Sequence, residues 1–137
     1  ESMQIEPHYA DVVKEISEFL NERADLAISA GILPANVIID PGIGFGKTRM
    51  QNLEILRHLE EFVTLGYVVA LGTSRKRFMG SICQETVFKD LVGATCATTV
   101  VGVRAGVRIF RVHDVRENRQ AMEIALATMA MKSRFAI

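Results

Sequence analysis

Two cationic residues, Arg111 and His113, are two positions apart in an apolar segment toward the end of the sequence. The segment, Val107-Arg-Ile-Phe-Arg-Val-His-Asp114, is predicted to be a β-strand. Side chains alternate between the two faces of a strand, so Arg111 and His113 share one face. Phe110 and Val112 share the other face, which suits a cover of helices. Paired cations at a strand end are typical of a site for an anion, above all phosphate.

An acidic residue ends a second apolar segment. Val37–Ile39 is predicted to be a short buried strand, and it is followed by Asp40, Pro41 and glycines at alternate positions between residues 42 and 46. Proline lacks a backbone donor and glycine permits unusual backbone angles, so the strand must end there. An acid at the carboxyl end of a buried parallel strand, beside backbone that a ligand can approach closely, is typical of binding sites in α/β proteins.

A nucleotide-binding P-loop is one alternative for this turn, because Gly46-Lys47-Thr48 matches the end of that motif. The motif also requires glycine at position 41, which is Pro41 in this sequence. A phosphate-binding hydrolase of the P-loop class is therefore disfavoured, and Lys47 is interpreted as a structural or solvated residue.

A third predicted strand, Tyr67–Leu71, leads through Gly72 and Thr73 into the cationic cluster Ser74-Arg-Lys-Arg77. The remaining segments have the apolar spacing of helices. These segments are residues 9–30, 52–64, 91–103 and 117–131. Helices that alternate with strands predict an α/β fold with a parallel sheet. We expect His113 and Arg111 to face the same cavity near Lys76.

The composition excludes several classes of function. Sixteen basic and sixteen acidic residues balance each other in a chain that is 49% hydrophobic and 23% charged. No surface for nucleic acid or for an anionic membrane is therefore indicated. No apolar run reaches the roughly 20 residues that span a bilayer. Cys83 and Cys96 form no CxxC pair and are predicted to be buried free thiols in a reducing compartment.

Three parallel strands cannot close a barrel, so we expect this chain to be the carboxyl-terminal part of something larger. Three ordered motifs, Asp40-Pro-Gly-Ile-Gly-Phe-Gly-Lys47, Ser74-Arg-Lys76 and Arg111-Val-His-Asp114, closely resemble the dihydropteroate synthase family. The resemblance covers essentially the whole chain. It implies strands six to eight, with flanking helices, of a TIM (β/α)8 barrel. Residues 1–137 would form a single partial pterin-binding domain whose amino-terminal half is absent.

The family condenses 6-hydroxymethyl-7,8-dihydropterin pyrophosphate with p-aminobenzoate, giving 7,8-dihydropteroate and pyrophosphate in folate biosynthesis. The resemblance implies a cytoplasmic transferase and sulfonamide target with these two small-molecule substrates, and no nucleic-acid or membrane partner. It implies Mg2+ as cofactor, with the protein ligand in the absent half and no metal ligand in this chain. A homodimer is expected from the small apolar faces of the last two helices. The chain alone is expected to be inactive.

By resemblance, the catalytic residues would be Lys76, Arg111 and His113. Lys76 would contact the pterin carbonyl and the p-aminobenzoate side, while Arg111 and His113 would hold the pyrophosphate as it leaves. Departure of pyrophosphate develops negative charge, which fixed cations stabilise by about 3 kcal/mol for each well-placed donor. No nucleophilic side chain is required, because the amine of p-aminobenzoate attacks.

The resemblance also implies a set of substrate-binding residues beside the three catalytic ones. Asp40 would hydrogen-bond the pterin ring, Phe45 would lie against the p-aminobenzoate ring, and Ser74 and Arg75 would shape that edge. Gly44 is also predicted to be substrate-binding. Each position has a structural alternative, such as a turn cap for Asp40 or simple packing for Phe45. Two alternatives remain for the whole chain: a non-catalytic half-barrel that binds a partner or a second copy, and another pterin-binding, methyltransferase-like protein.

Overall fold

The structure is a computed structural model that describes residues 8–130. Helices and strands alternate along this part of the chain, as the sequence predicts. Their order is α1 (Val12–Ser29), a 3-10 turn (Pro34–Asn36), β1 (Ile38–Ile39), α2 (Arg49–Arg57), α3 (Leu59–Val63), β2 (Val68–Leu71), α4 (Arg77–Cys83), a second 3-10 turn (Phe88–Asp90), α5 (Val92–Ala105), β3 (Ile109–Phe110) and α6 (Val115–Ala130). None of the helices within residues 8–130 is long and apolar enough to cross a membrane.

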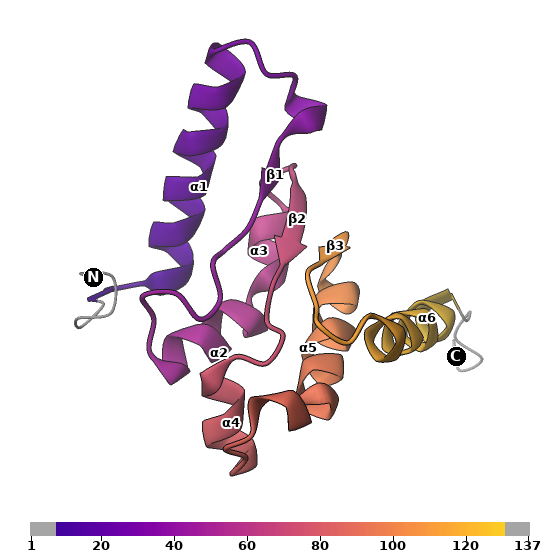
Figure 1. Ribbon diagram of the computed structural model, residues 1–137. Coiled ribbons are helices and arrows are strands. Elements are labelled where there is room, and N and C mark those ends of the chain that lie inside the picture. Colours follow the sequence, from indigo (N-terminus) through magenta and orange to yellow (C-terminus); the bar gives the residue numbers. More distant parts are fainter. Residues whose placement is uncertain (1–7, 131–137) are drawn as a thin grey trace, which may run out of the picture.

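The strands form one parallel sheet in the order β1-β2-β3. Ile38 of β1 pairs with Val68 of β2, and Ala70 of β2 pairs with Ile109 of β3. Figure 1 shows the three strands side by side, with α1 along one side of the molecule and α5 and α6 toward the other. Because the strands are parallel, their carboxyl ends lie at the same edge of the sheet.

Helices cover one face of this sheet, and the described residues leave the other face open. Ile39, Val69 and Leu71 are buried, whereas the side chains that alternate with them are not: Ile38 is 54% exposed and Ile109 is 39% exposed. In a (β/α)8 barrel the corresponding face is the barrel interior, which side chains of the other strands fill. The open apolar face therefore agrees with the prediction that these strands belong to a larger barrel.

The covered face packs on one hydrophobic core. Its fully buried large side chains come from α2, α3, β2 and the loop after β1: Ile55, Leu59, Phe62, Leu71 and Ile43. Helix α5 approaches the sheet closely at Gly102. A Cβ atom at this position would lie 2.7 Å from Cε1 of Phe110 and 3.0 Å from Cδ2 of Leu71. The absence of a side chain at Gly102 therefore sets the distance between α5 and the sheet.

The helix predicted over residues 52–64 differs from the structure at both its start and its middle. It begins earlier, at Arg49, because Thr48 and Gln51 form a reciprocal capping box. It also divides into α2 and α3 at His58, whose φ of −113° departs from helical geometry. Apolar spacing alone signals neither the cap nor the break.

The strand predicted over residues 107–114 is reduced to β3. The backbone N–H of Val107 donates to the Gly102 carbonyl and so completes the end of α5. The backbone N–H of His113 donates to the Ser74 hydroxyl. A local helix cap therefore takes one end of the predicted strand out of the ladder, and a tertiary contact takes the other.

Helix α4 has no counterpart in the sequence prediction, because its seven residues include a central glycine and show little helical periodicity. Burial of Phe78 and Met79 stabilises it instead. The prediction of buried thiols is wrong: Cys83 is exposed and Cys96 is partly exposed, although both are free. Cys83 is exposed because it lies at the end of this short surface helix.

We expect Gly102→Ala to lower the free energy of unfolding by about 1–3 kcal/mol, because the added methyl group would overlap Phe110 and Leu71. Gly93→Ala, in the same helix, is the matched control, since nothing lies within 4 Å of a Cβ atom there. Alanine is the better helix former, so this control should be neutral or slightly stabilised. Urea unfolding measures both variants, and equal stabilities would contradict the close packing of α5 on the sheet.

Candidate active site

The loops after the three strands bring the predicted site residues together at one edge of the sheet. Asp40 directly follows β1, and Arg111 directly follows β3. Each is two residues beyond an exposed isoleucine, Ile38 or Ile109, so each continues the open face. Lys76 lies close enough to both for their charges to act on its pKa. The structure therefore gathers an acid and two cations on the open face.

Lys76 is held between the backbone of Gly44 and the ring of Phe45. Its Nζ lies 3.8 Å from the ring centroid, a cation–π distance. A Cβ atom on Gly44 would lie 2.7 Å from Cδ of Lys76, and Gly44 has a φ of 80°. Both the available space and the backbone angle therefore require glycine at this position. Burial lowers the pKa of Lys76, Arg111 lowers this pKa further, and Asp40 opposes the shift.

Asp40 and Lys47 shape the loop after β1. Oδ1 of Asp40 accepts a hydrogen bond of 2.7 Å from the backbone N–H of Gly42. Nζ of Lys47 donates to the carbonyls of Gly42 and Phe45 at 2.9 and 3.0 Å. Burial lowers the pKa of Lys47, which Asp40 partly opposes. Lys47 is thus structural, as predicted, whereas Asp40 caps the turn with one oxygen and has no hydrogen-bond partner for Oδ2 among the described residues.

Arg111 lies across Gly72, the residue after β2. A Cβ atom on Gly72 would lie 2.9 Å from Nη2 of Arg111 and 3.3 Å from Nε. The guanidinium is exposed and forms no ion pair with any residue between 8 and 130. An unpaired guanidinium beside a partly desolvated ammonium is an arrangement that an anion would stabilise.

His113 is tied to the neighbouring loop through Ser74. Oγ of Ser74 lies 2.9 Å from Nδ1 of His113 and accepts the backbone N–H of His113 at 3.1 Å. Ser74 is only 5% exposed, whereas His113 is exposed. The hydroxyl predicted to shape the p-aminobenzoate edge is therefore engaged by the histidine.

Arg75 is turned away from the cationic cluster. Its Nη2 and Nε donate to the two carboxylate oxygens of Asp114 at 2.7 and 3.2 Å. This hydrogen-bonded pair raises the pKa of Arg75. The backbone of Arg75 is left-handed, with a φ of 59°, which is uncommon for a residue with a side chain. Arg75 is predicted to lie at the p-aminobenzoate edge. In the structure its guanidinium instead forms an ion pair with Asp114.

Asn52 is a site-supporting residue that the sequence prediction missed. It is buried in α2, and its Oδ1 accepts the backbone N–H of Gly44 at 2.6 Å. Its Nδ2 donates to the carbonyl of Thr48 at 2.7 Å. Asn52 therefore fastens the glycine loop to the start of α2. A polar residue at an inward position of an amphipathic helix is the signal that could have identified it.

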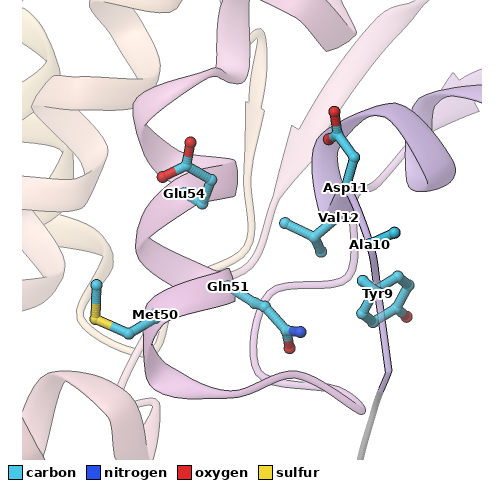
Figure 2. Close-up of a pocket in the computed structure, with 7 residues that line it drawn as sticks. All are labelled: Tyr9, Ala10, Asp11, Val12, Met50, Gln51 and Glu54. Atoms are coloured by element: carbon cyan, nitrogen blue, oxygen red, sulfur yellow. The ribbon is translucent and has the colours of Figure 1, made fainter.

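Two surface cavities lie outside this cluster. One, of about 360 Å3, is enclosed by the starts of α1 and α2 (Figure 2), with Tyr9, Asp11, Met50 and Glu54 among its lining residues. The other, of about 410 Å3, lies beside α4 and includes Arg77. No predicted site residue lines either cavity. The candidate site is instead on the open face of the sheet.

The described residues contain no group of three or more His, Cys, Asp or Glu side chains that could hold a metal ion. They therefore do not fit the Mg2+ that the resemblance implies. The chemistry of the cluster is that of hydrogen-bond donors and cations.

The comparisons with known proteins agree on one family. The model of the family described as pterin binding enzyme matches residues 1–113. The dihydropteroate synthase of Synechocystis sp. is 40% identical over 125 residues, which are 91% of this chain and 43% of that protein. The chain thus spans less than half the length of this curated relative.

Solved structures show the same fold. Dihydropteroate synthase from Stenotrophomonas maltophilia, with active site-bound imidazole, matches with a TM-score of 0.92 and 40% identity, covering 96% of this chain and 49% of that one. The enzyme from Xanthomonas albilineans in complex with 7,8-dihydropteroate matches with a TM-score of 0.90 and 36% identity, covering 94% and 48%. The prediction that the chain forms part of a TIM barrel is confirmed.

We expect Gly44→Ala to raise the pKa of Lys76, because the new methyl group would push the ammonium off Phe45 and into water, and burial is the main cause of the lowered pKa. Gly31→Ala is the control for backbone strain. Gly31 also has a positive φ, of 97°, but nothing lies within 4 Å of its Cβ position. NMR titration of the lysine side chains measures the shift, and an unchanged Lys76 pKa in Gly44→Ala would contradict this packing.

Proposed function

The chain belongs to the pterin-binding enzyme family, and on this premise we propose that it supplies the leaving-group side of a dihydropteroate synthase. The reaction would join 6-hydroxymethyl-7,8-dihydropterin pyrophosphate to p-aminobenzoate and release 7,8-dihydropteroate and pyrophosphate. The observation that carries the proposal is the unpaired guanidinium of Arg111 beside Lys76, on the open face where the strand ends converge. Relatives that share this fold are named as dihydropteroate synthases.

The proposed chemistry is a substitution at the exocyclic methylene carbon of the pterin. The bond from this carbon to the pyrophosphate oxygen breaks, and its electron pair leaves with the oxygen. The amine of p-aminobenzoate forms the new carbon–nitrogen bond and loses a proton. Arg111 and His113 would stabilise the charge on the departing oxygens, by about 3 kcal/mol for each well-placed donor. Because the donors are already positioned, little reorganisation is needed during the reaction.

Asp40, Phe45 and Lys76 are proposed to bind the two rings. Oδ1 of Asp40 is already occupied by Gly42, so Oδ2 would accept a ring N–H of the pterin. The ring of Phe45 is 56% exposed and would lie against p-aminobenzoate. Lys76, stacked on Phe45, stands between the two substrates and would contact the pterin carbonyl. In this arrangement one ammonium reaches both reactants.

The complete enzyme would be a barrel with all eight strands, in which the remaining strands supply the other pterin ligands and the Mg2+ site. The open sheet face and relatives about twice as long support the larger barrel. Leu126 and Met129, which are three positions apart in α6 and both exposed, offer an apolar surface for a homodimer. The free cysteines are compatible with a cytoplasmic location.

Two other functions are less well supported. In a P-loop hydrolase the lysine of the glycine-rich loop reaches the phosphates, but Lys47 is bound to carbonyls of its own loop. A non-catalytic half-barrel would have no reason to keep Arg111 unpaired beside Lys76, because two close cations destabilise each other in the absence of an anion. Pyrophosphate binding with no turnover by a complete barrel would favour that second function.

In the complete enzyme, Arg111→Ala should weaken binding of the pyrophosphate-bearing substrate by about 2–3 kcal/mol, because one charge-assisted pair is lost. Binding of p-aminobenzoate should change little. Arg77→Ala is the matched control, since Arg77 is an exposed cation next to Lys76 in sequence. Calorimetric titration measures both affinities, and equal losses for the two substrates would count against the anion site.

In the complete enzyme, Asp40→Asn should abolish pterin binding and leave the fold intact. The amide oxygen of asparagine can still accept the N–H of Gly42, so the turn is kept. The NH2 group of the asparagine would take the place of Oδ2. Two hydrogen-bond donors, this NH2 and the ring N–H of the pterin, would then face each other. Titration with a pterin analogue, beside a thermal melt, separates the two roles. Normal pterin affinity in a well-folded variant would assign Asp40 to the turn alone.

A further inference from the structure

Within residues 8–130, the hydroxyl of Ser74 makes two hydrogen-bonding contacts, and both are with His113. The backbone N–H of His113 donates to Oγ at 3.1 Å, and Nδ1 of the imidazole lies 2.9 Å from the same oxygen. The serine is buried, and the two residues are 39 positions apart in sequence, so the pairing joins the loop after β2 to the loop after β3. A single oxygen thus fixes both the backbone and the ring of His113.

The contact with Ser74 determines which ring nitrogen of His113 carries the hydrogen. The backbone N–H can only donate, so it uses one lone pair of Oγ. In neutral His113, Nδ1 could accept from the serine O–H or donate to the second lone pair of Oγ. Only the first arrangement gives this buried hydroxyl hydrogen an acceptor among residues 8–130, and it leaves the ring hydrogen on Nε2. In protonated His113 the Nδ1–H donates to the second lone pair of Oγ, and Nε2 again carries a hydrogen. Nε2 is therefore a donor both in the favoured neutral form and in the protonated form.

The ring is also held at a fixed place. Nδ1 faces Ser74, and Nε2 has no hydrogen-bond partner among residues 8–130, while the side chain of His113 is exposed. Arg75 and Asp114, the residues that follow Ser74 and His113 in sequence, form a bidentate pair that joins the same two loops. The donor on Nε2 is thus presented from a rigid loop.

Buried residues of two helices hydrogen-bond to the backbone of Arg75 and Asp114 and so hold this pair in place. The amide of Asn118 donates to the carbonyl of Asp114 at 2.8 Å and accepts from the hydroxyl of Thr99 at 2.7 Å. The hydroxyl of Thr95 accepts the backbone N–H of Arg75 at 3.3 Å. Thr95, Thr99 and Asn118 are all buried, so α5 and α6 fix the two loops from behind.

We propose that Ser74 is a positioning residue, which holds His113 so that its Nε2–H points at the departing pyrophosphate. This inference rests on the proposed function, and it differs from the prediction that Ser74 borders p-aminobenzoate. The serine acts through the histidine and does not itself touch a substrate. Removing its hydroxyl should lower the affinity for pyrophosphate and leave the affinity for p-aminobenzoate unchanged.

The test compares Ser74→Ala with Ser81→Ala in the complete enzyme. Ser81 is the matched control, because among the described residues its hydroxyl bonds only the carbonyl of Phe78 in α4. Nitrogen-15 NMR of the histidine rings, assigned with His113→Gln, should show Nε2 protonated and Nδ1 hydrogen-bonded in the unmodified protein. In Ser74→Ala the Nδ1 signal should move, and pyrophosphate affinity should fall about threefold to tenfold, the effect of one lost hydrogen bond.

An Nδ1-protonated ring in the unmodified protein would overturn the proposal, and so would an unchanged Nδ1 signal in Ser74→Ala. If Ser74→Ala does not fold, the ring signals of the unmodified protein still decide. An equal loss of p-aminobenzoate affinity in a folded Ser74→Ala would place the serine at the substrate edge instead. Failure of the unmodified enzyme to bind pyrophosphate would count against the proposed function, while the ring signals would still report on Ser74 and His113.

Discussion

The candidate site depends on two cationic side chains, each of which packs directly on the backbone of a glycine. Lys76 packs on Gly44, and Arg111 packs on Gly72, so each cation is held where a Cβ atom would exclude it. This packing keeps the two positive charges close enough for Arg111 to lower the pKa of Lys76. The repulsion would be relieved by an anion bound between them. The glycines of this site are therefore important for the space they leave as well as for their backbone angles.

Three consecutive basic residues after β2 have three different environments. Arg75 is left-handed and pairs with Asp114, Lys76 turns inward onto Phe45, and Arg77 is exposed at the start of α4. The ion pair of Arg75 with Asp114 joins the loop after β2 to the loop after β3. That joint holds the turn from which Lys76 projects, so a structural cation directly precedes a proposed catalytic one.

Local patterns predicted much of this arrangement, and contacts between distant residues account for what they missed. The alternation of helices and strands follows from apolar spacing, and the positions of Asp40 and Arg111 follow from strand ends. The partner of Arg75 lies 39 residues away, so no local pattern identifies it. The shortening of β3 has the same origin, since the Ser74 hydroxyl takes the N–H of His113. The burial of Phe78, which stabilises α4, is likewise tertiary.

The central claim is that Arg111 and His113 hold the leaving group of a dihydropteroate synthase, beside Lys76. A crystal structure of the complete enzyme with bound pyrophosphate tests it most directly. We expect pyrophosphate oxygens within about 3 Å of the Arg111 guanidinium and of Nε2 of His113, the distance of a charge-assisted hydrogen bond. Pyrophosphate bound elsewhere in the barrel, with the Arg111 guanidinium still unpaired, would contradict the claim.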